Sequence, residues 1–400
     1  MPRQCHDISF LLRHLVSPQA GAPTGKKSIL LNAFDIFAPG MLSPGQWNNP
    51  ADKGLQKFDI SFWVEYVKLL EKAACYRITP MNINQGGYDV YGGSMDETIK
   101  RATQYPVLDP TIISPIAAMA APPFLLDRRA STLDHITNGR FGWNIVTGWK
   151  KSAFQAIGLD EAIAHDLRYE SNITYRLWEG SWANDVVQYV ENNTYADPYH
   201  VHTIKHEGGL YRITTRHMVP PSPQRTPFLF QAGTSGAGVD FASTHAEAAF
   251  VAKLRAALAD KGRDPRSLKV FISLCPVLRT TDEEAREKLE GHKKYASVVG
   301  RLVQTSGVIG IDLSKASEGE KWTPRRVSEF AAIDEMERWI NEADIDGFNL
   351  VSVATPQSFE DVVELLVPEL RRWGLHAEPG EERLTTGSGW RTWPKCACFI

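Results

Sequence analysis

The 400-residue sequence lacks the features that mark several broad classes of protein. Its five cysteines are few, odd in number and scattered, which is a poor basis for disulfides and fits a reducing compartment. No apolar run approaches the roughly 18 residues that span a bilayer. The formal net charge is only −3, so no charge excess points to nucleic acid or to a membrane surface. We therefore expect a cytoplasmic globular protein.

Two local motifs are also missing. After the first predicted strand the chain reads Asp35-Ile-Phe-Ala-Pro-Gly40, without the glycine fingerprint of a dinucleotide-binding domain. Cys396 and Cys398 form a lone pair near the end of the chain, which we interpret as incidental rather than as a redox or metal site. No metal site is expected.

The two ends differ from the middle of the chain. Residues 1–27 are basic and little periodic, which predicts a disordered leader, with an organellar presequence as the alternative. Residues 376–400 predict an irregular tail. Residues 28–375 contain no linker or repeat and predict a single domain.

Within that domain short apolar runs alternate with helical periodicity. The predicted strands are Ser28–Phe34, Arg140–Thr147, Phe228–Ala232, Ala248–Ala252, Leu268–Cys275 and Gly347–Val353. The predicted helices are Ile60–Ala73 with Asp59 as N-cap, Glu161–Trp178, Gly238–Glu247, Asp282–Val298, Val327–Asn341 and Ser358–Arg372. Such alternation predicts a parallel α/β sheet, either doubly wound or closed into a barrel.

Three clusters could carry chemistry. The stretch Gln231-Ala-Gly-Thr-Ser-Gly-Ala-Gly238 follows a strand and opens a helix, so its amides and hydroxyls could hold a phosphate; a turn with a Ser N-cap explains it equally well. His165 and Tyr169 are spaced four apart on a predicted helix, with Arg168 between them, but a surface salt-bridged turn is the simpler interpretation. Asn144 is a polar residue in an apolar strand, and buried amides need partners.

A series of phrases, in order, resembles one enzyme family. These phrases are Leu31-Asn-Ala-Phe, Gly87-Tyr-Asp-Val-Tyr-Gly-Gly-Ser94, Ser131 to Thr147, His165-Asp-Leu-Arg-Tyr-Glu170, Leu177-Trp-Glu-Gly-Ser-Trp182, His206-Glu-Gly208, Pro221-Ser-Pro-Gln-Arg-Thr-Pro227 and Gln231-Ala-Gly-Thr-Ser235. The series is similar to the bacterial-luciferase-like flavin monooxygenases, in the branch of the nitrilotriacetate, dibenzothiophene-sulfone and dimethyl-sulfide enzymes. The resemblance runs from about residue 28 to residue 373.

The resemblance implies a TIM-type barrel of eight βα units that uses reduced FMN. It matches His165 and Tyr169, with Arg168 nearby, to the family's flavin contacts, and Ser235, with Thr234 beside it, to the phosphate contact. It also places Asn144 and Thr147 on the strand that faces the flavin ring. All seven are expected to bind the cofactor, and no residue is assigned a catalytic role.

The chain departs from the family around the second and third strands. The place of a family aspartate falls near Ile83, in a stretch weakened by Pro80. Ala117-Ala-Met-Ala-Ala-Pro-Pro-Phe124 directly joins two motifs that normally flank the third strand. Shorter gaps follow Tyr169 and Ala252 and fall after Phe330. Such clean losses indicate mis-joined coding segments, and we expect an incomplete or distorted barrel with an open seam between Ile83 and Arg140.

The expected function is that of a two-component monooxygenase that uses reduced FMN and O₂ to oxygenate a small organic substrate. The resemblance implies an NAD(P)H-dependent flavin reductase as partner, and we expect a homodimer or higher homo-oligomer. One alternative is a non-catalytic or truncated relative with impaired flavin binding. Another is a deazaflavin-dependent hydride-transfer enzyme of the same superfamily.

Overall fold

The computed structural model describes most of the chain between residues 27 and 378. The described residues are 27–75, 77–80, 89–107, 123–139, 141–145, 154–155, 158–164, 167, 170, 173–183, 186, 195–231, 235–246, 248–249, 254–315 and 332–378. For residues 77–80 only the backbone is described.

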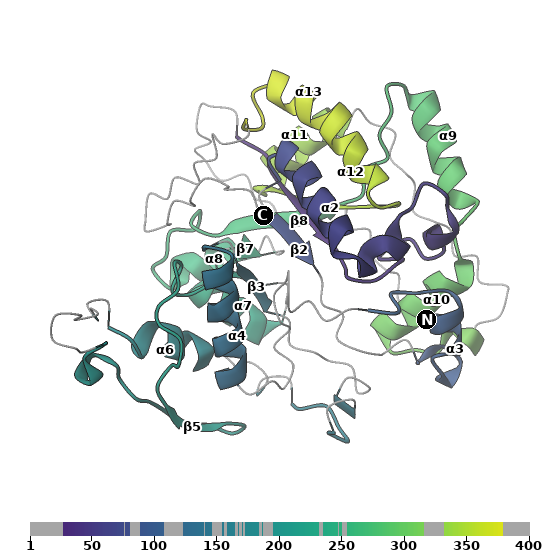
Figure 1. Cartoon of the computed structure of the whole chain (residues 1–400). Coiled ribbons are helices and arrows are strands. Elements are labelled where there is room, and N and C mark those ends of the chain that lie inside the picture. Colours follow the sequence, from purple (N-terminus) through teal and green to yellow (C-terminus); the bar gives the residue numbers. More distant parts are fainter. Residues whose placement is uncertain are drawn as a thin grey trace.

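A parallel sheet forms the centre of the molecule (Figure 1). Its seven described strands are β1 (Leu30–Asp35), β2 (Arg77–Pro80), β3 (Gly142–Ile145), β6 (Phe228–Gln231), β7 (Ala248–Ala249), β8 (Lys269–Leu274) and β9 (Gly347–Val351). They lie in the order β2-β1-β9-β8-β7-β6-β3, and every adjacent pair is parallel. This is the order of a barrel in which one strand between β2 and β3 is lacking from the described residues.

The sheet confirms the expected incomplete barrel. Its two edges, β2 and β3, bracket the interval from Ile83 to Arg140 in which we expected an open seam. The described parts of that interval, 89–107 and 123–139, contain helices and turns and no strand. Residues 108–122, where the missing third strand would fall, lie outside the described residues. The curled parallel sheet is nevertheless that of a luciferase-like barrel.

The helices lie outside the sheet. They are α2 (Ile60–Lys72), α3 (Asp96–Lys100), α4 (Pro123–Ile136), α6 (Ile173–Gly180), α7 (Gly236–His245), α8 (Leu254–Asp260), α9 (Asp282–Lys293), α10 (Val298–Ile309), α11 (Ala332–Glu342), α12 (Gln357–Asp361) and α13 (Val367–Arg372). A π-helical turn, Val362–Leu366, joins α12 to α13. In Figure 1, α2, α12 and α13 lie together over one end of the sheet, and α4, α6 and α7 over the other.

Two apolar clusters fill the space between helices and sheet. The larger packs Leu31 and Ala33 of β1 and Phe348 of β9 against α2, α11 and α13. The smaller packs Trp143 of β3 edge-on against Trp178 of α6, with ring centroids 5.8 Å apart. Both use every second residue of a strand, so the alternate residues face the inside of the curled sheet.

The helix boundaries follow from capping and from tertiary contacts. Asp59 is the N-cap of α2, as expected: its carboxylate accepts the backbone N–H of Ser61. The expected helix Asp282–Val298 instead ends at Lys293. Ser297, whose N–H donates to the carbonyl of Pro44, caps a second helix, α10, through the N–H of Gly300.

The predicted helix Glu161–Trp178 is wrong at its start. Residues 161–164 are not helical, and α6 begins only at Ile173. Glu170 is held instead by the turn of a hairpin formed by β4 (Ile204–Glu207) and β5 (Arg212–Thr215), which the periodicity did not indicate. Its carboxylate accepts the N–H groups of Leu210 and Tyr211, contacts that no local pattern encodes.

Candidate functional site

The inner face of the curled sheet is the natural place for a ligand in this architecture. Strand register aligns its side chains in rows. One row contains Leu30, Phe271 and Gly347, and the next contains Asn32, Ser273 and Asn349. At the other end of the sheet, Asn144 of β3 lies opposite Phe230 of the adjacent strand β6. The second row is nearer the carboxyl ends of the strands.

Aromatic side chains form much of this inner face. Phe228, Phe230, Ala248 and Phe271 are buried in one cluster, with Leu30 packed against it. The rings of Phe228 and Phe230 lie 4.9 Å apart. Because the interior here is apolar, a polar group in it must find a partner within it.

Three buried amides interrupt this apolar interior. The Nδ2 of Asn32 donates to the Oδ1 of Asn349 over 3.1 Å. The Oδ1 of Asn144 and the Nδ2 of Asn349 have no hydrogen-bond partner among the described residues, and both are shielded from solvent. Asn144 is only 6% exposed. The sheet therefore places one unsatisfied acceptor and one unsatisfied donor inside the curl.

The inner side of β8 is exposed near the carboxyl end of the strand. Ser273 and Cys275, two residues apart at the end of this strand, are both exposed to solvent. Yet desolvation raises the pKa of the Cys275 thiol to about 11.

A helix N-terminus follows the carboxyl end of β6. Ser235 is the N-cap of α7, and its Oγ accepts the N–H of Gly238 over 3.1 Å. This is the geometry of the simpler interpretation, a Ser-capped turn. It also directs the first amides of α7 away from the helix, as an anion site requires. The two interpretations are compatible.

Of the expected site residues, the structure describes Asn144 and Ser235. Asn144 lies in β3, and Ser235, the N-cap of α7, follows the neighbouring parallel strand β6. The other five expected contacts lie outside the described residues: Thr147, His165, Arg168, Tyr169 and Thr234.

Several family phrases prove to hold segments next to the β4–β5 hairpin or to join α4 to β3. Ser181 donates from its Oγ to the carbonyl of His202 and accepts the N–H of His217. The indole of Trp182 donates to the carbonyl of His217. The side chain of Gln224 donates to Asp134 and to the carbonyl of Phe141. In the described residues these phrases are structural contacts, which sequence spacing alone did not distinguish from ligand contacts.

A buried network joins α4 to the end of the hairpin. The Nδ1 of His217 pairs with Asp127, and its Nε2 lies 3.0 Å from the Oγ of Ser131. The order of contacts, Ser131 to His217 to Asp127, resembles that of the nucleophile, base and acid of a catalytic triad. However, they are between 0 and 4% exposed, so no substrate can reach the hydroxyl, and we assign them a structural role. Burial raises the pKa of Asp127 to about 6.

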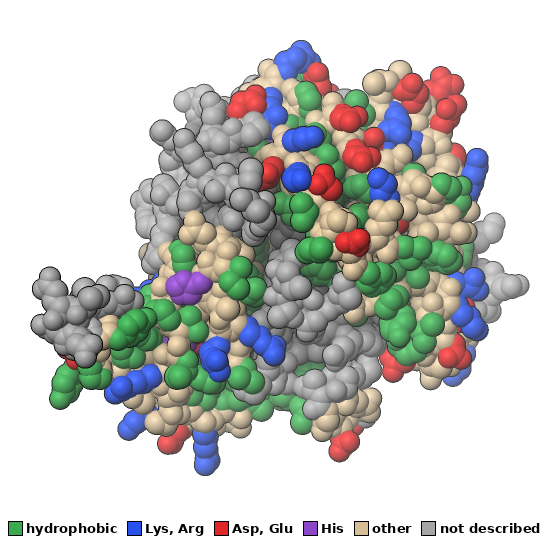
Figure 2. Space-filling model, viewed as in Figure 1, with side chains coloured by type: hydrophobic (Ala, Val, Ile, Leu, Met, Phe, Trp, Pro, Cys, Tyr) green, Lys and Arg blue, Asp and Glu red, His purple; other side chains and the backbone are tan. Residues whose placement is uncertain are grey.

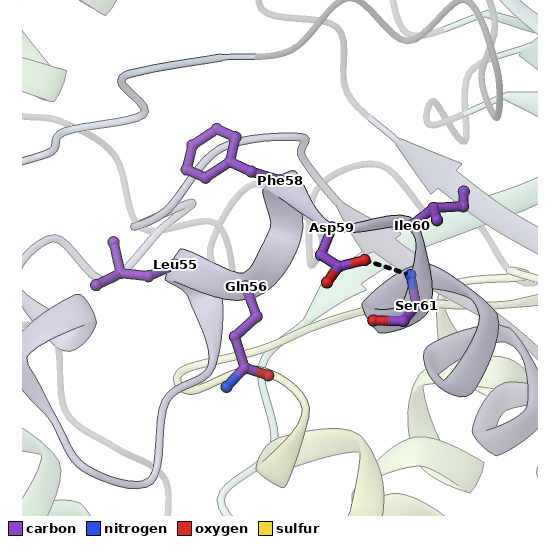
Figure 3. Close-up of a pocket in the computed structure, with 6 residues that line it drawn as sticks. All are labelled: Leu55, Gln56, Phe58, Asp59, Ile60 and Ser61. Carbon is purple, nitrogen blue, oxygen red and sulfur yellow. Dashed lines mark hydrogen bonds between the residues drawn. The ribbon is translucent and has the colours of Figure 1, made fainter.

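A shallow hollow on the outer surface is a poor candidate for the active site. It is lined by one continuous segment, shown in Figure 3: Leu55, Gln56, Phe58, Asp59, Ile60 and Ser61. Its only charged residue, Asp59, is used to cap α2.

The described surface and helices suggest no other site class. Acidic and basic side chains are interspersed on the face shown in Figure 2. No group of three or more His, Cys, Asp or Glu among the described residues could hold a metal ion. Within the same residues no helix has the length and apolarity to cross a bilayer.

Comparison with known proteins agrees with this architecture. A long-chain alkane monooxygenase from Geobacillus thermodenitrificans (strain NG80-2) is 36% identical over 415 aligned residues, covering 89% of this chain and 92% of the relative. A dimethyl-sulfide monooxygenase from Hyphomicrobium sulfonivorans is 35% identical, covering 87% of each chain. Because 415 aligned positions exceed the 400 residues of this chain, the first alignment contains gaps in this chain.

Solved structures give the same picture. A long-chain alkane monooxygenase superposes with a TM-score of 0.81 at 34% identity, covering 88% of this chain and 93% of that one. A riboflavin lyase, solved with a modified FMN and riboflavin, superposes with a TM-score of 0.77 at 26% identity, covering 88% and 93%. The family model described as luciferase-like monooxygenase matches residues 113–365. The chain therefore belongs to the luciferase-like family of flavin-dependent monooxygenases.

Proposed function

We propose that this protein is the oxygenase of a two-component system, using reduced FMN and O₂ to oxygenate a small organic substrate. The observation that carries the proposal is the inner face of the sheet. There Phe228, Phe230 and Phe271 are buried in one cluster, Asn144 lies opposite Phe230 with its Oδ1 unsatisfied, and the capped N-terminus of α7 follows β6. A flat heterocycle with a phosphate fits this combination.

Ser235 and the amides that follow Gly233 would hold the FMN phosphate. The helix N-terminus supplies N–H donors and a favourable dipole. By family resemblance Arg168 and Tyr169 would assist, with His165 and Thr147 at the ring and Thr234 beside the phosphate. Asn144 offers a buried acceptor, which suits an N–H group of a flavin ring.

Reduced FMN, when bound, supplies the electrons with which one atom of O₂ is inserted into substrate and the other leaves as water. The chain's own part is to place the substrate and exclude bulk water. Phe228, Phe230 and Phe271 do so by packing into a continuous apolar wall. Asn144 would fix the orientation of the ring against this wall.

The inner face favours an uncharged substrate. Apart from β2, whose side chains are not described, the inner-facing residues near the carboxyl ends of the described strands carry no formal charge at neutral pH. They are Asn32, Phe34, Asn144, Phe230, Ser273, Asn349 and Val351. Burying a charged substrate there without a counter-ion would be costly. Long-chain alkanes and dimethyl sulfide, after which two relatives are named, therefore suit this face better than nitrilotriacetate, after which a third is named.

A flavin reductase is the proposed partner. The sequence has no dinucleotide fingerprint, and one relative is named as component A of its system. The test combines the purified protein with NADH, FMN, ¹⁸O₂ and either an alkane or dimethyl sulfide, with and without an added flavin reductase. We expect substrate-linked ¹⁸O only when the reductase is present. NADH oxidation by the isolated protein at a comparable rate would contradict the two-component assignment.

One observation favours a second candidate, a relative with impaired flavin binding. The sheet has two edges, at β2 and β3, where a closed barrel has none. Ring contacts expected from the region near residue 83 and from the third strand would then be lost, while the α7 site is retained. We therefore propose weak FMN binding and slow turnover for the 400-residue chain, since misplacement by about 1 Å can cost about a hundredfold in rate.

A further inference from the structure

A second pair of amides lies on the inner face, on strands that the family phrases do not connect with the flavin. Asn32 of β1 and Asn349 of β9 are directly opposite each other in register. Both are 1% exposed, and their side chains are joined by the Nδ2 of Asn32 and the Oδ1 of Asn349. The bond fixes the Asn349 amide plane and leaves its Nδ2 without a partner among the described residues.

The register that creates this pair is fixed by close packing one row below. A Cβ on Gly347 would lie 2.1 Å from the carbonyl oxygen of Leu30 and 2.7 Å from its Cβ. Only glycine permits this approach of β9 to β1. Two residues on, the same register brings Asn349 opposite Asn32 and places it on the inner face.

No neighbouring group among the described residues accepts a hydrogen bond from the Nδ2 of Asn349. The row below contains Leu30 and Phe271, and the row above contains Phe34 and Val351. Ser273, opposite Asn349 on β8, is exposed and does not satisfy the donor. Leaving a buried donor unsatisfied is costly, so a bound ligand that accepts its hydrogen bond accounts for its presence here.

We propose that the Nδ2–H of Asn349, oriented by Asn32, donates to a carbonyl oxygen of the bound flavin ring. The inference rests on the proposed function and adds to it a contact from the β1–β9 side. A neutral amide donor suits a neutral carbonyl rather than a phosphate, which charged groups and helix N-termini bind. Alkanes and sulfides have no carbonyl, whereas the flavin ring has two, so the ring is the ligand that this donor fits.

The test uses the full chain and FMN as the probe. Asn349→Leu removes the donor at similar volume, and Asn349→Val is the alternative if leucine does not fold. A neutral hydrogen bond contributes modestly, so we expect the Kd of FMN to rise about threefold to tenfold. The visible absorption bands of bound FMN should shift as well, because a ring carbonyl loses its hydrogen bond.

Ser306→Ala is the matched control. The Ser306 hydroxyl is also fully buried and accepts one N–H, that of Leu313, but it lies on α10, away from the inner face. This variant should leave both the Kd and the spectrum unchanged. Failure of the wild-type chain to bind FMN would count against the proposed function itself. Binding by the wild type with an unchanged Kd or an unchanged spectrum in the Asn349 variants would overturn the present inference and assign Asn349 a structural or water-bound role.

Discussion

At the scale of single residues, the side chains that matter most for the candidate site are buried and polar. Asn144 could be found from the sequence because it is a polar residue within an apolar strand. The same signal was available for Asn32 and Asn349, which interrupt LLNAF and GFNLV. Which face each residue occupies depends on strand register, and register is a tertiary property. That is why the pair and its unsatisfied donor emerge only from the fold.

Asp127 gives a pH prediction at this scale. Burial raises its pKa from 3.8 to about 6, despite the pairing with His217. Between these values the folded state binds more protons than the unfolded state, so the stability contributed by Asp127 is present at low pH and is lost as pH rises toward about 6. Asp127→Asn should flatten this slope in urea midpoints measured from pH 4 to 7. The effect is at most about 3 kcal/mol at about 1.4 kcal/mol per pKa unit.

Ser131→Ala provides the control for that measurement. It removes the hydroxyl 3.0 Å from Nε2 of His217 but retains Asp127 and His217. It should lower stability and keep the pH slope. Equal slopes in the wild type and Asp127→Asn would show that Asp127 does not titrate in this window.

At the scale of elements, periodicity located six strands and most helices but not the tertiary hydrogen bonds that hold them in place. Six strands and the start of α2 were predicted within a few residues. The β4–β5 hairpin was missed because its strands are only four residues long and half exposed. The helix expected from Glu161 failed because Glu170 is committed to that hairpin. Tertiary hydrogen bonds outweigh weak helix propensity here.

Gln224 tests whether the family phrase around it is structural. Its side chain donates to Asp134 and to the carbonyl of Phe141, and so ties the 221–227 segment to α4 and β3. Gln224→Ala should cost about 2–4 kcal/mol, because one of the lost bonds is to a charged, buried carboxylate. Urea denaturation measures the loss, and limited proteolysis should cut the 195–226 region faster. An exposed matched change, Gln56→Ala, should do neither. A Gln224 variant of wild-type stability would reopen a ligand role for the phrase.

At the scale of the whole molecule, the sheet is a barrel with one strand missing from the described residues. The resemblance predicted this from the direct joining of Ala121 and Pro122 within motifs that usually flank a strand. The sequence therefore predicted where the edges of the described sheet lie. It did not predict the exposure of Ser273 and Cys275 at the end of β8, because exposure is a tertiary property. The single-domain boundaries and the homo-oligomeric state stay predictions.

Adding the segments that the chain lacks relative to its family should restore FMN binding and oxygenase turnover. Inserting a family-like third strand after Ala121, with an aspartate in place of Ile83, would allow β2 and β3 to be joined through a new strand. We expect tighter FMN binding and faster reductase-coupled turnover, as the ring regains contacts and the edges are paired. A scrambled insert of the same length is the control. Tight binding and rapid turnover in the unaltered chain would show that the opening is not damage.

The central claim is that FMN binds inside the curled sheet with its phosphate at the N-terminus of α7. The most direct measurement is a fluorescence titration of the wild type, Ser235→Ala and Ser297→Ala with FMN and with riboflavin, which lacks the phosphate. Ser297 caps α10 as Ser235 caps α7, so it controls for the loss of a cap. We predict saturable FMN binding that Ser235→Ala alone weakens by about 1.5–3 kcal/mol, roughly tenfold to a hundredfold, with riboflavin binding unchanged. FMN affinity that is the same in Ser235→Ala as in the wild type would contradict the claim.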